Sequence, residues 1–589
     1  MNKNIKYISN SINKRSETTH NAYVRRMQSQ ASFGKTRSTL SCGNLAHAIA
    51  ACSLSQKNTI LDSTRMNVGI ISAYNDMLSA HAPYQHYPDQ IKKALLDLGH
   101  SAQVAGGVPA MCDGVTQGQA GMDLSLFSRD LIAQATALSL SHNTFDATLL
   151  LGICDKIAPG QLIGALSFGH LPTAFVPSGP MSTGISNDEK VMIRGKYAEG
   201  KLNKNALQDM ENRAYHAPGT CTFYGTANTN QLVFEAMGLM PQGSAFIPYD
   251  SGLRIAMTKY ISQNIINARP LYQVVNAASI VNGLVALLAS GGSTNHTLHM
   301  IAIARAAGII ITWEDFNDLS KIVPSLTSLY PNGPADINAF EQAGGTPTLM
   351  KALMERGLLN MDAKPIWGDL ADYAKCPVLE QDKVVFVNAQ DSNNASVIST
   401  PNTCFSEQGG LRLLSGNCGR GIIKISAVAA QDRIVEAPAM VFESQHDVEK
   451  AYQAGLMNKD VIVVLRHNGP AANGMPELHK LMPLLSNLMK LGFKVALVTD
   501  GRLSGASGKV PAAIHITPEA ALNGPLSLIK NGDIIRLDAD NGTLETTADL
   551  SERIPFHPDL TSEHSGSGRE LFQIFRKVVS SADTGASIF

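Results

Sequence analysis

Residues 146–156 read DATLLLGICDK, and this stretch decides the fold class. A run of apolar residues without polar alternation is typical of a strand buried on both faces, as in a parallel sheet. The polar residues Cys154, Asp155 and Lys156 follow where the strand ends. Residues 67–76, NVGIISAYND, repeat this order of apolar strand and polar loop. The two stretches predict a large N-terminal α/β domain with a mainly parallel sheet.

Helical patterns separate these strands. Residues 87–99 carry apolar side chains at helical spacing and end at a glycine, and residues 124–141 predict a long helix. Between them, residues 103–107 predict a strand, followed by a Gly-rich loop that contains Cys112 and Asp113. Ligands of open α/β sheets lie beyond the carboxyl ends of the strands, so these loops are the expected site.

The secondary-structure pattern of the sequence changes after about residue 390. Residues 185–390 are mostly helical in pattern, whereas the later part has short β-like runs such as VIVVLR and KVALVTDG, with two clear helices at 447–457 and 475–491. This predicts a smaller C-terminal β-rich, barrel-like domain. The expected division is a mobile polar start (1–35), an α/β domain (36–392) and a β-rich domain (393–589).

Composition excludes several classes of protein. The hydrophobic fraction is 44% and the formal net charge is -1, which excludes a disordered chain and gives no basic surface for nucleic acid or an anionic membrane. The apolar runs are shorter than the ~18–20 residues that span a bilayer. The polar N-terminus has no apolar segment of a secretory signal. We therefore expect a cytoplasmic protein without nucleic-acid or membrane partners.

The eight cysteines indicate chemistry rather than disulfides. They include no CxxC pair, so neither a disulfide framework nor a zinc knuckle is expected. Two of them form Cys–Asp pairs, Cys112–Asp113 and Cys154–Asp155, on neighbouring loops. Thiolates favour iron–sulfur clusters or zinc, and carboxylates favour Mg²⁺ or Mn²⁺. The pairs therefore indicate two adjacent metal centres.

A set of motifs in order along residues 40–560 resembles the dihydroxy-acid and sugar-acid dehydratases. The motifs are GIISAYNDMLSAHAPY, VPAMCDGVTQGQAGM, LLLGICDK, PSGPM, GTCTFYGTANTN, SGGSTNH, GPAANGMPEL and VTDGRLSG. Within that family, AYNDMLSAH and NGMPELHKL are similar to the members that act on a phosphorylated sugar acid.

The resemblance implies two cofactors, a [4Fe–4S] cluster and Mg²⁺ (or Mn²⁺). It assigns cluster-holding cysteines and metal-binding carboxylates, a lysine that is carbamylated in relatives and so becomes a further metal ligand, and a serine that acts as the base. These residues are Cys154 and Cys221 for the cluster, Asp113, Asp155 and Glu443 for the metal, Lys156 for the carbamylated lysine, and Ser504 for the base.

The chain departs from the family at one cluster ligand. Relatives carry a third cysteine in the loop after the first strand, where this chain has Ala80. His81 or Cys112 can supply the third protein ligand, or a substrate or solvent oxygen can take its place. Cys112 is slightly favoured because it adjoins Asp113.

The resemblance implies loss of water from 6-phospho-D-gluconate to give 2-dehydro-3-deoxy-6-phospho-D-gluconate in the Entner–Doudoroff pathway, by a homodimer. The alternatives are a dehydratase of dihydroxy acids or unphosphorylated sugar acids, and an iron–sulfur regulatory protein on the same scaffold. The candidate partners of the phosphate are Arg466, Arg502 and Lys190.

Overall fold

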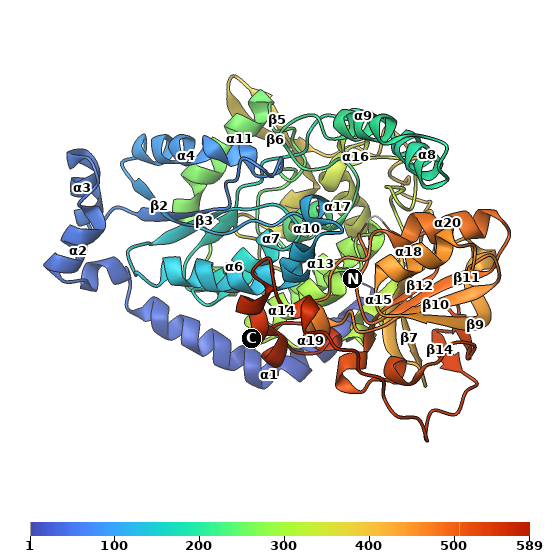
Figure 1. The fold of residues 1–589 in the computed structure, drawn as a ribbon. Coiled ribbons are helices and arrows are strands. Elements are labelled where there is room, and N and C mark those ends of the chain that lie inside the picture. The colour runs from blue at the N-terminus through green and yellow to red at the C-terminus, as the bar shows by residue number, and fades with distance from the viewer. Residues whose placement is uncertain (1, 506) are drawn as a thin grey trace.

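A four-stranded parallel sheet lies inside the N-terminal part of the chain (Figure 1). The computed structural model describes residues 2–505 and 507–589. Every residue of the first and third strands is buried, as their continuous apolar runs require. The strand order is β2-β1-β3-β4. The strands are β1 (Asn67–Ser72), β2 (Ser101–Gly107), β3 (Ala147–Leu151) and β4 (Thr173–Phe175).

Two helices that follow β2 and β3 pack closely against each other. They are α6 (Ser125–Leu140) and α7 (Ile157–Leu166). A Cβ atom at Gly160 would lie 2.4 Å from the carbonyl oxygen of Arg129, and one at Gly164 would lie equally close to the next turn of α6. The two glycines therefore allow a contact between helix backbones, and this contact fixes the loops at the starts of both helices.

Of the remaining helices in the described chain, four lie before or among the first strands, at residues 42–116, and ten more lie between residues 187 and 355. The bounds are α2 (Cys42–Ile49), α3 (Leu54–Leu61), α4 (Tyr87–Leu96), α5 (Asp113–Thr116), α8 (Asn187–Ala198), α9 (Lys204–Ala214), α10 (Thr226–Ala236), α11 (Gly252–Asn264), α12 (Leu271–Val274), α13 (Ala277–Ala289), α14 (His296–Ala306), α15 (Trp313–Ser320), α16 (Ile337–Gln342) and α17 (Gly345–Glu355).

The C-terminal part contains a closed eight-stranded β-barrel (Figure 1). Its interior is a separate apolar core, with residues such as Val464, Val498 and Ile535 fully buried. The strand order is β10-β11-β12-β8-β7-β14-β13-β9. The bounds are β7 (Leu411–Gly416), β8 (Gly419–Lys424), β9 (Ile434–Phe442), β10 (Val461–Leu465), β11 (Val495–Thr499), β12 (Ala512–Thr517), β13 (Ile534–Asp538) and β14 (Thr543–Thr546). The predicted fold class, an α/β part followed by a barrel, is confirmed.

Short elements join and flank the two parts. A separate antiparallel hairpin precedes the barrel, and four helices lie among or after the barrel strands. They are β5 (Lys375–Glu380), β6 (Lys383–Asn388), α18 (Gln445–Gln453), α19 (Pro470–Asn473), α20 (Leu481–Lys490) and α21 (Gln573–Val578).

The first residues do not form the expected mobile start. Residues 3–32 form helix α1 (Lys3–Ser32), and its buried side chains include Ile5, Ile8 and Ile12. These three isoleucines are spaced by three and four residues, which places them on one face of a helix. That face joins the main hydrophobic core, and packing rather than polar composition therefore decides the structure of this segment.

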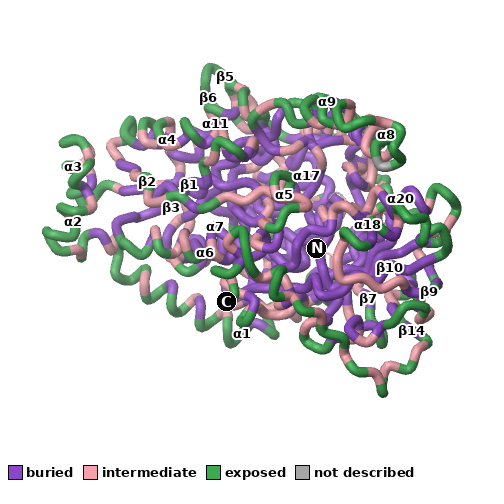
Figure 2. Tube along the Cα trace, in the orientation of Figure 1, coloured by how far each residue is buried: buried purple, intermediate pink, exposed green. Residues whose placement is uncertain are grey.

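The helix expected at 475–491 begins later than its pattern predicts. Gly474 and Met475 have positive φ angles of 78° and 58°, and Pro476 follows, so the chain turns before α20 starts at Leu481. Residues 475–480 form a loop, and Glu477 in this loop makes a β-bridge with Arg502. Figure 2 shows that the chain between the sheet and the barrel is largely buried.

Candidate active site

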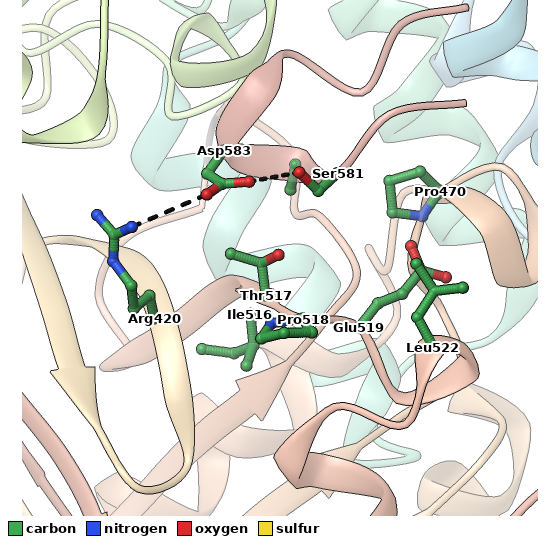
Figure 3. Close-up of a pocket in the computed structure, with 10 residues that line it drawn as sticks. Arg420, Pro470, Ile516, Thr517, Pro518, Glu519, Leu522, Ser581 and Asp583 are labelled. Carbon is green, nitrogen blue, oxygen red and sulfur yellow. Dashed lines mark hydrogen bonds and ion pairs between the residues drawn. The ribbon is translucent and has the colours of Figure 1, made fainter. Parts of the chain in front are cut away.

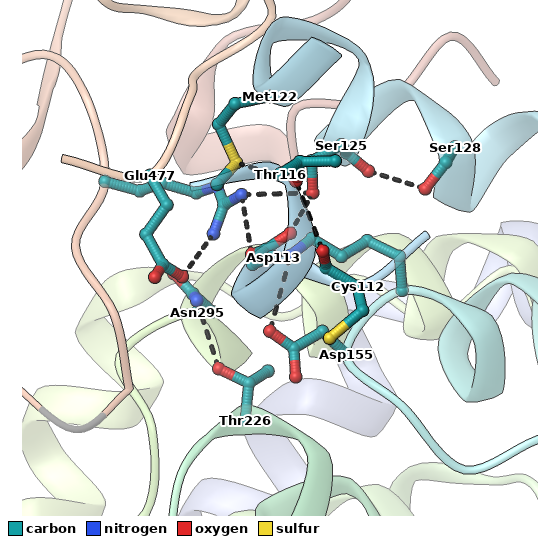
Figure 4. A network of polar contacts seen from close by, with 12 residues as sticks. Cys112, Asp113, Thr116, Met122, Ser125, Ser128, Asp155, Thr226, Asn295 and Glu477 are labelled. Atoms are coloured by element: carbon teal, nitrogen blue, oxygen red, sulfur yellow. Dashed lines mark hydrogen bonds and ion pairs between the residues drawn. The ribbon is translucent and has the colours of Figure 1, made fainter. Parts of the chain in front are cut away.

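Three carboxylates from distant parts of the chain meet in the interior. One oxygen each of Asp113, Asp155 and Glu477 lies within 4.8 Å of the others (Figure 4). Asp113 is the first residue of α5 after β2, and Asp155 follows β3. Glu477 comes from the loop before α20. Oxygen ligands at this separation can hold a hard divalent cation such as Mg²⁺ or Mn²⁺.

Two buried cations face this acidic group. Lys156 donates to Asp113 and lies 3.4 Å from Asp155, and Arg502 donates to Asp113 at 3.0 Å and to Glu477 at 3.2 Å. Burial alone would raise the pKa of Asp113, but Arg502 and Lys156 hold it below its usual range. Asp113 is therefore an ionised carboxylate in the interior of the protein.

The other two carboxyl groups shift in the opposite direction. Burial raises the pKa of Glu477 to about 8, and the neighbouring charge of Asp113 adds to the rise. Burial and Asp113 also raise the pKa of Asp155, against the effect of Lys156. The three carboxylates repel one another, and a divalent cation between them would relieve that repulsion.

Three thiols lie beside the acidic group. The thiols of Cys112 and Cys154 act on each other, and this interaction lowers the pKa of Cys112 and raises that of Cys154. Burial, Cys112 and Asp155 raise the pKa of Cys221 to about 12. Buried thiols that influence one another in this way lie close enough to bind a common inorganic group, which would lower their pKa values.

The spacing of the thiols does not fit a single metal ion. Sulfur atoms around one zinc ion would be separated by roughly 3.8 Å. Among the described residues, only the acidic group has three ligand atoms within 4.8 Å of one another, so Cys112, Cys154 and Cys221 do not form such a set. A larger group, such as an iron–sulfur cluster, fits the three thiols better.

His81 also lies near the cysteine loops. Its side chain is completely buried, and its Nε2 lies 3.4 Å from the backbone nitrogen of Ile153, next to Cys154. Its Nδ1 has no hydrogen-bond partner among the described residues. Burial lowers the pKa of His81 to about 3, so the imidazole is neutral. Its neighbour Ala80 is buried too.

Ser504 lies on a loop that reaches the N-terminal part of the chain. A Cβ atom at Gly505 would lie 2.7 Å from Ser293 Oγ and 2.8 Å from the backbone nitrogen of Thr226. Thr226 is the first residue of α10, five positions after Cys221. Thr226 and Ser293 are hydrogen-bonded to each other at 2.7 Å. The Ser504 loop is therefore packed against the segment that carries Cys221.

The structure places Glu443 away from the acidic group. Its carboxylate accepts from Arg466 at 2.8 Å, and its side chain is 36% exposed. Glu477 takes the position that was expected for Glu443. Glu477 lies in the motif NGMPELHKL, but the sequence pattern predicted a helix there rather than a loop that could reach the site. Arg502 and Ser125 both donate to Asp113; the sequence suggested Arg502 only as a partner of the phosphate group, and it gave no signal for Ser125.

Comparison with known proteins supports one family throughout. The family model described as "Dihydroxy-acid/6-phosphogluconate dehydratase N-terminal" matches residues 65–372, and its C-terminal counterpart matches residues 396–586. The chain belongs to this dehydratase family. The matched ranges correspond to the α/β part and the barrel of this dehydratase-family member, and the acidic group draws its carboxylates from both.

Individual relatives cover almost the whole chain. It is 52% identical to "Phosphogluconate dehydratase" of Escherichia coli (strain K12), over 100% of this chain and 99% of the relative. It is 51% identical to the protein of that name from Pseudomonas aeruginosa, over 98% of this chain and 97% of that relative. "Dihydroxy-acid dehydratase" of Agathobacter rectalis is 33% identical over 83% of this chain and 86% of that relative. Among the described residues, no helix is both long and apolar enough to cross a membrane.

Proposed function

We propose that this chain catalyses the dehydration of 6-phospho-D-gluconate to 2-dehydro-3-deoxy-6-phospho-D-gluconate and water, the Entner–Doudoroff step. The observation that carries the proposal is the buried acidic group beside three thiols, in a chain about half identical to phosphogluconate dehydratases over their full length. Such paired oxygen and sulfur ligands suit a dehydratase that uses two different inorganic centres.

The proposed ligands follow from the donor atoms. Asp113, Asp155 and Glu477 would hold Mg²⁺ or Mn²⁺, and Cys112, Cys154 and Cys221 would hold a [4Fe–4S] cluster, with Cys112 rather than His81 as the third protein ligand. The mutual effects of the three thiols on their pKa values support Cys112. When bound, the two centres would supply Lewis-acid stabilisation of the developing enediolate and of the departing hydroxyl group.

Lys156 is a buried cation beside the carboxylates that would hold the metal ion. Its ammonium group is completely buried and donates to Asp113. An ammonium group has no lone pair and repels a metal ion, so Lys156 has to lose a proton before it can act as a ligand. Addition of carbon dioxide to the neutral amine would then give a carbamate, an anionic oxygen donor of the kind that Mg²⁺ prefers. We propose that carbamylation of Lys156 accompanies metal binding.

Ser504 is the proposed base that removes the proton from C2. A serine hydroxyl group is a weak base in water and needs nearby positive charge to stabilise its alkoxide. Arg502 lies two positions earlier on the same loop and is 1% exposed. After loss of the C2 proton and the C3 hydroxyl group, the enol product tautomerises to the 2-keto acid.

An anaerobic assay of 2-keto acid formation tests the proposal. Protein with iron and sulfide quantified is mixed with Mg²⁺ and either 6-phospho-D-gluconate or 2,3-dihydroxyisovalerate. Product from the first substrate, with about four irons per chain, is expected. Preference for the second would favour the activity named for the 33% identical relative. A full cluster with neither product would favour a regulatory protein. The homodimer and the cytoplasmic location remain predictions, and mass photometry tests the former.

A further inference from the structure

The proposed substrate carries a phosphate group, and a cation of the chain has to meet it. Phosphate in a partly desolvated site is stabilised by Lys or Arg side chains. Two arginines are natural candidates, because both are buried near loops of the C-terminal part. Both already donate their hydrogen bonds to other groups of the protein.

Arg502 is saturated by the acidic group and its surroundings. Its Nε donates to the carbonyl oxygen of Met475 at 2.8 Å, and its other nitrogens donate to Glu477, Asp113 and Ser125. Removing it from these partners would leave Asp113 with less compensation in the interior. Arg502 therefore holds carboxylates and is not available to a phosphate group.

Arg466 is also fully engaged. Its Nε and Nη2 donate to Glu443 at 3.0 and 2.8 Å, and its Nη1 faces three backbone carbonyl groups. Its guanidinium group lies 4.4 Å from the centroid of the Phe556 ring. These contacts use all three nitrogens of Arg466 within the protein, so we assign it a structural role.

Lys190 is different because its charge is buried without a counter-ion. It lies in the first turns of α8 and is 6% exposed, and its Nζ donates to Asn187 at 3.3 Å. Among the described residues, no carboxylate oxygen lies within 4.0 Å of it. Burial lowers the pKa of Lys190, and Arg194 adds to that effect. A buried ammonium group in this state gains from an anion that enters beside it.

The two carboxylates whose charges act on Lys190 are Glu211 and Asp336, and both are bound to other partners. Glu211 accepts two bonds from Arg194, each of 2.8 Å. Asp336 accepts from Thr183 at 2.6 Å and caps α16 through the backbone nitrogen of Ala339 at 3.0 Å. Neither can move to Lys190 without losing these bonds.

Lys190 also lies within electrostatic reach of the site. Its charge lowers the pKa of Cys221, and Cys221 in turn raises that of Lys190. On the next turn of the same helix, Arg194 acts on His479, which also senses Asp113. Helix α8 packs against α20. It therefore borders the loops that carry the thiols and the acidic group.

We propose that Lys190 forms the subsite that binds the phosphate group of the substrate, an inference that rests on the function proposed above. The ammonium group supplies the counter-charge, and binding of the phosphate places the sugar acid with its carboxylate end toward the acidic group. Lys190 acts on binding and takes no part in proton transfer.

Two other places in the molecule fit a phosphate group less well. Lys424 is the other described lysine that is buried without a carboxylate partner; it donates to the carbonyl oxygen of Gly291 at 2.9 Å, and burial alone lowers its pKa to about 7. No charge of the site acts on it. A cavity of about 340 Å³ at the barrel rim contains Arg420, but Asp583 and Glu519 line it as well (Figure 3).

Steady-state kinetics with 6-phospho-D-gluconate and D-gluconate test the subsite. In K190M we expect KM for 6-phospho-D-gluconate to rise roughly 10- to 100-fold, as for loss of a charged hydrogen bond, with kcat changed less than about threefold. The kcat/KM ratio of the two substrates should fall by the same factor. Inhibition by inorganic phosphate should weaken in parallel, and K190R should restore most of the affinity.

Three controls make the result decisive. K196M changes an exposed lysine of the same helix and should leave all constants unchanged. K424M tests the rival lysine, and iron content with the thermal midpoint checks folding. An unchanged KM in K190M, or an equal loss for both substrates, overturns the subsite, as does a selective loss in K424M instead. A wild-type protein that forms no 2-keto acid from 6-phospho-D-gluconate refutes the proposed function itself.

Discussion

Replacement of Glu477 by glutamine separates the carboxylate found in the acidic group from the one expected from sequence. The ligand atoms of Asp113, Asp155 and Glu477 lie within 4.8 Å of one another, so a cation at their centre lies within about 2.8 Å of each. At an effective dielectric constant near 20, one carboxylate then contributes about 6 kcal/mol of attraction per unit of cation charge.

Only part of that attraction appears as affinity. Desolvation offsets much of it, and the amide oxygen of glutamine retains a dipole, so we expect a net loss of about 3 kcal/mol. This corresponds to a dissociation constant for Mn²⁺ that is roughly 100-fold larger. The isosteric change keeps an acceptor for Arg502, which limits damage to the fold.

The assay is a titration of anaerobically prepared protein with Mn²⁺, followed by electron paramagnetic resonance of the free ion. E443Q is the matched control, because Glu443 pairs with Arg466 on the partly exposed rim and should bind Mn²⁺ as the wild type does. Unchanged affinity in E477Q together with a loss in E443Q would refute the reasoning and restore the assignment made from sequence.

Three further changes test the thiols, the base and a buried acid. C112S should lower iron and sulfide per chain while C376S, on the β5–β6 hairpin, should not; equal iron in both would remove Cys112 from the cluster ligands. S504A should lower kcat at least about 100-fold with iron content unchanged, and full activity in S504A would rule the serine out as base. Burial raises the pKa of Glu519 to about 8, so the folded protein keeps a proton that the unfolded chain has lost. The stability that this group contributes is therefore lost as pH rises from about 4.5 to 8. In urea unfolding, the free energy of unfolding of E519Q should gain on that of the wild type by about 1.4 kcal/mol per pH unit in that window. Parallel pH curves for the two proteins would contradict this.

The strands and their loops could be predicted because their signals are local. The apolar runs of β1 and β3 are continuous in sequence and fully buried in the structure. Parallel strands end at a common edge, so the positions of Asp113 and Asp155 after strands of one sheet indicated that they would meet. The structure places them in one group.

The contribution of the C-terminal part could not be predicted in the same way. Glu443 follows β9 and Glu477 follows α19, and both positions are loops of the barrel region. Which of these loops faces the sheet depends on how the barrel docks, and local pattern carries no information on docking. The positive φ angle of Met475, which turns the chain away from a helix, is equally hidden from periodicity.

Helix α1 shows the opposite case, in which a usable signal was outweighed by composition. Ile5, Ile8 and Ile12 have helical spacing, yet polar residues surround them. A narrow apolar stripe is enough to bind a helix to a large core, and the average polarity of the segment conceals it.

Arg502 explains why the two parts of the chain form one site. It lies 389 positions after Asp113, donates to it at 3.0 Å and holds Glu477 through another nitrogen. The ionised state of Asp113 therefore depends on a cation supplied by the barrel part. On the proposed assignments, the N-terminal part supplies Lys190 and the thiols, whereas the barrel part supplies Ser504 and Glu477. A substrate bound between them would meet Lys190 and the thiols of one part and Ser504 and Glu477 of the other, so catalysis would require the docked arrangement that Arg502 stabilises.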